Sequence, residues 1–241
     1  MTLVTDALDR IARQVSIDQP ASWLTATDDE HVEIRDDFLL ETVDNILERL
    51  DLPSPIGKQT TITGDGSETY SLPSDFKRLQ RDVAAVYETT TVRRICTPIT
   101  DDGSWTYLKE VGSAGATRYY RLSGYDGNWS ISFFRNPSAN IQIVVSYVSN
   151  LWMAAADGTA GSAFTAADDV LLFPRRLIEA GTVARWRERK GLDASGKMLE
   201  YENEMSRLIN DRRSIRKINM AGNAPVLKPW DIPVPDFIPD S

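Results

Sequence analysis

Histidine and cysteine are almost absent from this chain of 241 residues, which holds one of each, His31 and Cys96. A single cysteine excludes an internal disulfide framework and a multi-cysteine metal site. We expect Cys96 to be a buried structural thiol in a strand. A single histidine nearly excludes imidazole-based triads and histidine-rich zinc sites, and we expect His31 to lie at the surface. The sequence therefore lacks the side chains on which the common triad and zinc chemistries depend.

Long apolar runs are lacking as well. No stretch approaches the ~20 apolar residues of a membrane-spanning helix, and the N-terminus shows no basic-then-apolar signal layout. We therefore expect a protein made and used in a cytosol-like compartment. In such a compartment the sequon Asn128-Trp129-Ser130 is interpreted as hairpin sequence.

The net charge of −8 is unevenly distributed along the chain. Residues 1–57 hold four arginines against thirteen acids, whereas residues 168–217 hold twelve basic and nine acidic side chains. Regions of opposite sign suit head-to-tail packing between copies. The acidic total argues against a dedicated nucleic-acid binder, which carries a basic footprint.

Acids are densest between Asp28 and Asp37. This cluster lacks the glycine and the ordered ligands of a calcium loop. We interpret it as a solvated acidic face or as a contact between subunits.

Helical patterns lie at the two ends of the chain. Apolar residues recur at helical spacing from Leu3 to Val15, with Thr2 placed to cap that helix, and again from about Asp28 to Leu50. The connection over 18–27 holds Trp23, which we expect to be exposed.

Two further helices are expected near the C-terminus. Pro174 fits the first turn of a helix that runs to Lys190 and is ended by Gly191. Asp193 or Ser195 would cap the next helix.

The middle of the chain has a different texture, with short alternations of β-branched and aromatic residues between Gly/Asp turns. The predicted strands are 59–63, 68–72, 81–88, 92–97, 106–110, 117–123, 129–135 and 141–148, with turns at 64–66, 101–103 and 126–128. Many short strands at this spacing predict an antiparallel sandwich or a small barrel.

These patterns together predict an α+β fold. The N- and C-terminal helices would form one bundle, and an antiparallel β-sandwich or barrel would be inserted in a bundle loop. The expected divisions are bundle helices over 1–57 and 154–217, a β domain over 58–153 and an extended arm over 218–241. The bundle is expected to resume through a flexible Ala/Gly/Ser/Thr stretch over 154–167.

The nearest approach to a catalytic motif is 191–197, which has the G-x-x-x-x-G-K spacing of a phosphate loop. Met198 stands where that loop needs a hydroxyl for magnesium, and a basic helix end precedes it instead of a buried strand. We therefore interpret 191–197 as a turn between helices. Paired-carboxylate catalysis would need two acids to converge, and no spacing singles out a pair. We expect no enzymatic activity and no cofactor.

The last part of the chain, 218–241, holds five prolines separated by apolar residues. Each proline fixes φ and removes a backbone donor, so neither a helix nor a central strand is available. A pre-extended segment of this kind loses little entropy when it docks. It is either a tail folded over its own domain or an arm that grips another subunit or a partner protein.

Basic residues lead into this arm. Cations at a helix C-terminus are stabilised by the helix dipole, and they could also pair with acidic groups of a partner. We expect Trp230 to anchor the contact, at a cost of about 2 kcal/mol or more on truncation to alanine. The candidate partner-binding residues are Arg212, Arg213, Arg216, Lys217, Leu227, Trp230, Ile232, Phe237 and Ile238.

One local string resembles a known family. It reads Tyr70-Ser71-Leu72-Pro73-Ser74-Asp75-Phe76-Lys77-Arg78-Leu79. This aromatic-x-Leu-Pro-x-Asp-Phe run, followed by a basic pair and leucine, resembles the head-to-tail adaptor (connector) proteins of tailed bacteriophages, including those called tail tubular protein A. We expect a strand that ends at the proline and a short turn that Asp75 and Phe76 begin. The order of elements is also similar, from N-terminal helices through a β insertion to two late helices and an extended C-terminus.

The resemblance implies a structural virion protein made in the bacterial host cytoplasm. It implies a ring, usually of twelve copies, bound below the portal at the capsid vertex, with the C-terminal helix and arm on portal subunits. The next tail or stopper protein would bind the opposite face, and packaged double-stranded DNA would pass through the lumen without sequence-specific contacts. Acidic surface over 28–37 would limit sticking of DNA if it lined that lumen.

Two other classes of function remain open. One is another tail-completion protein or a glycan-binding virion module, favoured if Tyr107, Tyr119, Tyr120 and Trp129 lined an open groove. The other is a carboxylate-based cell-wall hydrolase.

Overall fold

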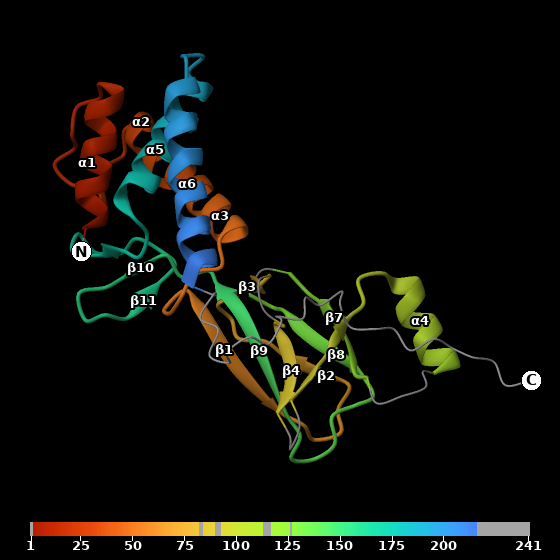
Figure 1. Ribbon diagram of the computed structural model, residues 1–241. Helices are drawn as coiled ribbons and strands as arrows, with labels where there is room; N and C mark the ends of the chain where they lie inside the picture. Colours follow the sequence, from red (N-terminus) through yellow and green to blue (C-terminus); the bar gives the residue numbers. More distant parts are fainter. Residues whose placement is uncertain (1, 82–83, 90–92, 113–116, 126, 216–241) are drawn as a thin grey trace, which may run out of the picture. The chain divides into compact units, whose positions relative to one another are not determined.

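The computed structural model describes residues 2–81, 84–89, 93–112, 117–125 and 127–215, apart from the side chains of 212–215. The chain divides into two units, Met1–Met205 and Ser206–Ser241. The first unit holds helices near both of its ends and sheets between them (Figure 1), which confirms the α+β fold. The described part of the second unit continues the last helix.

The elements are as follows. The helices are α1 (Val4–Val15), α2 (Asp29–Val32), η1 (Glu33–Phe38), α3 (Leu39–Arg49), α4 (Asp102–Val111), α5 (Arg175–Arg189) and α6 (Ser195–Ile215). The strands are β1 (Gly57–Thr63), β2 (Thr69–Ser71), β3 (Phe76–Leu79), β4 (Val86–Thr89), β5 (Arg93–Ile95), β6 (Thr97–Pro98), β7 (Tyr119–Ser123), β8 (Ser130–Phe134), β9 (Gln142–Ser149), β10 (Met153–Ala154), β11 (Ala160–Gly161) and β12 (Val170–Leu171).

The first helix starts without a side-chain cap, so the predicted cap at Thr2 is wrong. The residue before α1 is Leu3, whose backbone forms a β-bridge with Val170. The N–H of Val4 donates to the carbonyl oxygen of Asp169 at 2.8 Å. A main-chain acceptor from a distant loop therefore satisfies a donor that a helix start leaves free.

The connection between α1 and α2 is packed onto the helices. Trp23 is buried and donates its indole N–H to Asp9 at 2.7 Å. The ring of His31 meets the Trp23 ring edge-on and its Nε2 lies 2.7 Å from the carbonyl oxygen of Asp18. The predictions of an exposed Trp23 and a surface His31 are therefore wrong, because the connection gives each ring a polar partner within the fold.

The long helix predicted from about residue 28 to 50 forms as α2, η1 and α3 in direct succession. The middle segment, η1, is π-helical, a wider turn that shifts the register of the side chains and is frequent at functional sites. Beyond it, Leu39, Val43 and Ile46 are buried, and α3 packs on α5.

Gly181 of α5 lies at a close contact between helices. A Cβ atom there would lie 2.6 Å from Cγ2 of Thr42 and 2.9 Å from the ring of Tyr201. Tyr201 also donates its hydroxyl to Asn45 Oδ1 at 2.9 Å, which links α6 to α3. The absence of a side chain on one helix thus permits the close packing of the N-terminal and C-terminal helices.

The turn between α5 and α6 follows the prediction. Pro174 directly precedes α5, and Gly191 has a φ of 70° just after it. Asp193 then accepts the N–H of Ser195 at 2.9 Å. The stretch with phosphate-loop spacing is therefore a helix–helix turn.

Three sheets lie between the helices. One has the order β1-β9-β4-β5, with β3 also paired to β9, and is antiparallel. The second has the order β2-β8-β7-β6, in which β6 and β7 are parallel, and the third has the order β11-β10-β12. The two larger sheets share one apolar core that includes Ile62, Phe76, Ile131, Phe133 and Val145. The described strands form open sheets and no closed barrel, so the sandwich alternative describes them better.

Five of the predicted strands match β1, β2, β7, β8 and β9. Within the described residues, the segment predicted over 81–88 contains most of β4, and the segment predicted over 92–97 contains β5 and the start of β6. The strand predicted over 106–110 is wrong, because this stretch lies in α4. Asp101 accepts the N–H of Ser104 at 2.6 Å and caps that helix, so the residues predicted as a turn are a helix start.

The stretch predicted as flexible, 154–167, takes part in the third sheet. β10 pairs with β11 and with β12, and Asp169 accepts the N–H groups of Thr165 and Ala166 at 2.8 and 2.9 Å. This buried carboxylate organises the loop that also caps α1. Several backbone groups of this stretch are therefore hydrogen-bonded within the fold.

Candidate functional site at the Leu72–Arg81 segment

The segment from Leu72 to Arg81 contains the most distinctive string of the sequence. Leu72 is buried and its N–H donates to the carbonyl oxygen of Trp129 at 2.9 Å, beside the β2–β8 pairing. The carbonyl oxygen of Pro73 accepts the N–H of Phe76 at 3.0 Å. A turn is therefore present, but it lies earlier than predicted. Phe76 ends this turn and does not begin it, and it is the first residue of β3, which pairs with β9.

Asp75 fixes this turn through three contacts. Its Oδ2 accepts from Lys58 Nζ at 2.6 Å and its Oδ1 accepts from the hydroxyl of Tyr147 at 3.0 Å. Its carbonyl oxygen accepts the N–H of Asn150 at 2.9 Å. Burial, followed by the nearby carboxylate of Asp75, raises the pKa of Tyr147, so its hydroxyl stays protonated and donates.

Phe76 supplies the apolar part of the anchor. It is buried, and its ring centroid lies 5.6 Å from that of Tyr147 and 5.8 Å from that of Trp129. Aromatic pairs in this range add to the stabilisation from burial. The Phe76 ring therefore joins strands of the two larger sheets.

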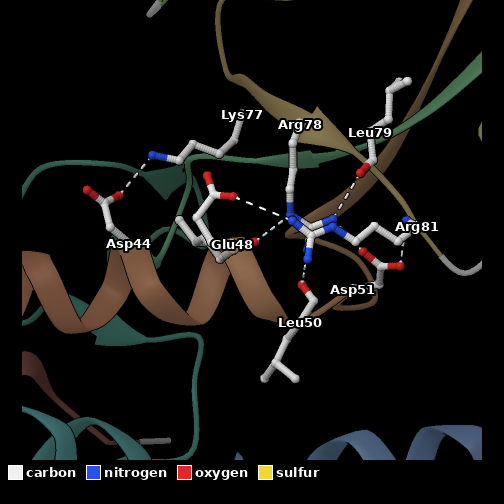
Figure 2. Close-up of polar contacts among 9 residues, drawn as sticks. Asp44, Glu48, Leu50, Asp51, Lys77, Arg78, Leu79 and Arg81 are labelled. Carbon is white, nitrogen blue, oxygen red and sulfur yellow. Dashed lines mark hydrogen bonds and ion pairs between the residues drawn. The ribbon is translucent and has the colours of Figure 1, made fainter. Parts of the chain in front are cut away.

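Arg78 connects the sheets to the end of α3 (Figure 2). Its Nε donates to the carbonyl oxygen of Leu47 at 2.8 Å and its Nη2 to that of Leu50 at 2.9 Å. Its Nη1 donates to Asp51 Oδ1 at 2.7 Å and to the carbonyl oxygen of Leu79 at 2.9 Å. The planar guanidinium thus satisfies carbonyl groups that the end of a helix leaves free, and it places a positive charge at the negative end of the helix dipole.

The ion pair of Arg78 and Asp51 is well shielded from water. Each side chain is only 11% exposed. Asp51 Oδ2 also accepts the N–H of Arg81 at 2.8 Å, so both of its oxygens are used. Buried charges are tolerated when they are paired and hydrogen-bonded, and removal of one partner is strongly destabilising.

Two outer ion pairs flank this central contact. Lys77 donates to Asp44 Oδ1 at 3.1 Å, and Arg81 lies 3.8 Å from Glu48 (Figure 2). These pairs are more exposed, and exposed pairs contribute little to stability. The basic pair of the string therefore has one structural member, Arg78, and one surface member, Lys77.

The acids over 28–37 divide into paired and outward-facing groups. Arg35 donates two hydrogen bonds to Asp36, at 2.7 and 2.6 Å, and Lys190 lies 3.0 Å from Glu33. Asp29 and Asp37 are exposed. Among the residues described, no three His, Cys, Asp or Glu side chains gather as a metal-binding group.

The other candidate residues are placed as follows. Cys96 is buried between β5 and β6, and burial raises the pKa of its thiol to about 11, so its interpretation as a structural thiol is confirmed. Tyr120 is buried in the sheet core, whereas Tyr107 is exposed on α4. The aromatic groove considered for glycan therefore does not include Tyr120.

The predicted partner-binding residues are not tested by this structure. Arg212 and Arg213 fall in α6, but their side chains lie outside the described residues. So do all of the others, Arg216, Lys217, Leu227, Trp230, Ile232, Phe237 and Ile238. Within α6, Arg207 lies 3.9 Å from Asp211, one turn later.

Sequence reasoning missed the role of Arg78 and the whole of β3. The local signal was weak, because Phe76-Lys77-Arg78-Leu79 has an apolar residue at each end and a basic pair between them, not the alternation that is typical of a strand. The short length of this run weakened the signal further.

The sequence matches the model of a known protein family. Its model, described as SU10 adaptor protein, matches residues 2–226. No curated protein matches the chain. In the described part of the chain, no helix is long and apolar enough to cross a membrane.

Proposed function

Since the chain belongs to the SU10 adaptor protein family, and is therefore a structural adaptor of a bacteriophage virion, we propose that it assembles as a ring between the portal and the tail. Twelve copies is the proposed number, with a lumen through which double-stranded DNA passes on ejection. The protein has no enzymatic activity in this role. The match of the family model over 2–226 is the observation that carries the proposal.

The charge distribution supports assembly of copies in a ring. Residues 1–57 carry a net negative charge and residues 168–217 a net positive charge. Some of these charges pair within the chain, as Glu33 does with Lys190 and Glu41 with Arg185, and the remainder can face a neighbouring copy. A contact between two different surfaces is heterologous, and it gives a ring when the rotation between copies closes. The same acidic surplus would limit adhesion of DNA phosphate to a lumen that it lined.

The contacts of the Leu72–Arg81 segment support a different role for each part of the chain. Asp75, Phe76 and Arg78 make their contacts within the subunit. The Leu72–Arg81 segment therefore serves to hold the sheets against α3. The portal contact is instead assigned to the C-terminal stretch 207–241, through its basic residues and its apolar residues between prolines. The downstream tail or stopper protein would bind the opposite face of the ring. A likeness to tail tubular protein A within this class of proteins remains part of the proposal.

Deletion of residues 222–241 tests this assignment. We expect a truncated protein with the circular dichroism spectrum and thermal midpoint of the full chain that no longer co-sediments with portal-bearing heads. Retained co-sedimentation at the same stoichiometry would refute the assignment of the portal contact to this stretch.

A further inference from the structure

Two hollows adjoin on one side of η1 and α3. Their volumes are about 310 Å³ and about 420 Å³, and both are lined by Leu40, Trp152 and Ser162. They therefore form one groove, which we call the α3 groove. Phe164 lies at one end of it and Lys77 at the other.

The α3 groove has an apolar part formed by Leu40 and Trp152. Leu40 is 38% exposed although it lies on a helix whose neighbouring residues Leu39 and Val43 are buried. Trp152 is buried beneath, and its indole N–H is already used by the carbonyl oxygen of Ser162 at 2.7 Å. This apolar part offers contact area to an apolar side chain and does not need a polar partner from it.

The rim of the groove exposes carboxylates. At one end Asp36 is 46% exposed and its partner Arg35 only 17%. At the other end Asp44 is 64% exposed and its partner Lys77 only 22% (Figure 2). Because the cations lie deeper than the acids, the groove presents negative charge to an incoming segment, next to the acidic stretch 28–37.

One part of the same sequence has the complementary chemistry. From residue 212 to residue 230 there is no Asp or Glu, while Arg212, Arg213, Arg216, Lys217 and Lys228 are basic. The stretch ends in Val226-Leu227-Lys228-Pro229-Trp230, where apolar side chains flank one lysine. It therefore joins apolar anchors to positive charge in the combination that the apolar part and the rim of the groove match.

We propose that the α3 groove of one copy receives the stretch Leu227–Trp230 of a second copy, with the preceding basic residues on the acidic surface over 28–37. Trp230 or Leu227 covers Leu40, and Lys228 lies at the carboxylate rim. The inference rests on the proposed ring, because a segment that each copy donates to the next is a heterologous contact that a ring can close. Under this inference the portal contact proposed above for 207–241 narrows to Ile232, Phe237 and Ile238, and deletion of 222–241 removes it together with the groove contact.

The length and composition of the stretch suit a donated segment. At about 3.1 Å per residue, an extended segment with as many residues as 216–230 spans roughly 45 Å. The prolines at 225 and 229 each fix one φ angle, which lowers the entropy lost on docking.

Cysteine cross-linking between two distinguishable full-length chains tests the proposal. One chain carries Leu40→Cys and a small tag, and the other carries Trp230→Cys and a large tag. The native Cys96 is buried with a raised thiol pKa and should stay unreacted. After co-expression and mild oxidation, we expect a disulfide-linked species with the summed mass of the two chains.

The matched control replaces Leu40→Cys with Leu199→Cys on α6, where the native residue is 63% exposed. This pair should cross-link at least fivefold less. Lys228→Glu in the donor chain and 1 M salt should each lower the yield of the Leu40→Cys pair, because both weaken the charge match.

Equal yields for the two pairs would overturn the proposal. A chain carrying both Leu40→Cys and Trp230→Cys that closes on itself, with no link in the mixture, would also overturn it by placing the chain's own segment in the groove. Rings and portal binding that persist without the cross-link would refute the groove contact and leave the proposed function standing. Loss of both ring formation and portal binding in the unsubstituted protein would refute the proposed function itself.

Discussion

Two neighbouring stretches along α3 differ in how their charges are arranged. Near its C-terminal end, Arg78 and Asp51 are each 11% exposed, and the guanidinium reaches two carbonyl groups of the α3 end. Along the α3 groove, Asp44 is 64% exposed above a lysine, and Leu40 is open to solvent. In the first arrangement the charged groups are buried and hydrogen-bonded within the chain. In the second, a carboxylate and an apolar side chain are exposed to solvent.

This difference separates what builds the subunit from what is left for a partner. A buried pair with all its bonds made holds the sheets against the helix, and its removal would leave an unpaired charge inside the fold. A groove with an exposed leucine can be altered at little cost to the fold. Substitutions in the buried contact at the end of α3 should therefore change stability, and substitutions along the α3 groove should change assembly.

Arg78→Ala should have the largest effect on stability. It removes four hydrogen bonds and leaves Asp51 without its guanidinium partner, so we expect a loss of about 3 kcal/mol in the free energy of unfolding. Urea denaturation followed by circular dichroism would measure it. Lys77→Ala, the neighbouring exposed pair, should cost less than about 1 kcal/mol, and equal losses for the two variants would contradict the distinction.

Gly181→Ala should have the next largest effect on stability. Gly181 lies where α5 meets α3 and α6. The new methyl group would lie 2.6 Å from Thr42 and 2.9 Å from the Tyr201 ring. Overpacking of this kind costs ~1–3 kcal/mol, and the better helix propensity of alanine returns roughly 1 kcal/mol. We expect a net loss of about 1 kcal/mol in the same urea experiment. A gain in stability would show that the helices are less tightly packed than these distances imply.

The pair of Arg49 and Glu202 should make a smaller contribution that depends on pH. Two hydrogen bonds from Arg49, both of 2.6 Å, lower the pKa of Glu202, with burial opposing them. Because the folded pKa is lower than the unfolded one, the stabilisation is present above the ordinary glutamate value of about 4.3 and is lost as the pH falls through the lowered folded value. Both side chains are more than a third exposed, so the contribution is under about 1 kcal/mol.

Arg49→Met isolates this pair. The stability difference between wild type and variant should be measurable at pH 7 and should decrease as the pH falls below the ordinary pKa of glutamate, as followed by thermal denaturation. A difference that grew on acidification would contradict the sign of the pKa change.

Leu40→Ser should have the smallest effect on stability, within about 0.5 kcal/mol of wild type, because an exposed surface substitution rarely changes folding. Its effect should instead appear in assembly, as fewer closed rings by native mass spectrometry. A loss of several kcal/mol in the free energy of unfolding would show that Leu40 belongs to the core. It would contradict the distinction between the buried Arg78 contact and the exposed α3 groove.

The sequence predicted the elements with strong periodicity and missed those decided by distant partners. Helices with apolar stripes and strands with clear alternation were found, because their signals are local. The cap of α1 comes from the carbonyl of Asp169, and the burial of Trp23 depends on Asp9, and no local pattern reports such contacts. α4 was misassigned because its short apolar alternation resembled a strand, although Asp101 and Ser104 provided a capping signal.

The candidate site was predicted only in outline. The string around Leu72–Phe76 indicated the family, and its turn was expected, but the role of Arg78 depends on the end of a helix some thirty residues earlier in the chain. The groove at Leu40 could not be predicted, since it is formed by η1, α3 and a loop more than a hundred residues later. Such sites arise from the tertiary arrangement alone.

Electron microscopy of portal-bearing heads incubated with this protein tests the central claim most directly. We predict a ring of twelve copies at the portal vertex, present with the full chain and absent with the chain that lacks residues 222–241. Heads without any added density, or equal density with both proteins, would contradict the proposed adaptor role of the ring and of its C-terminal arm.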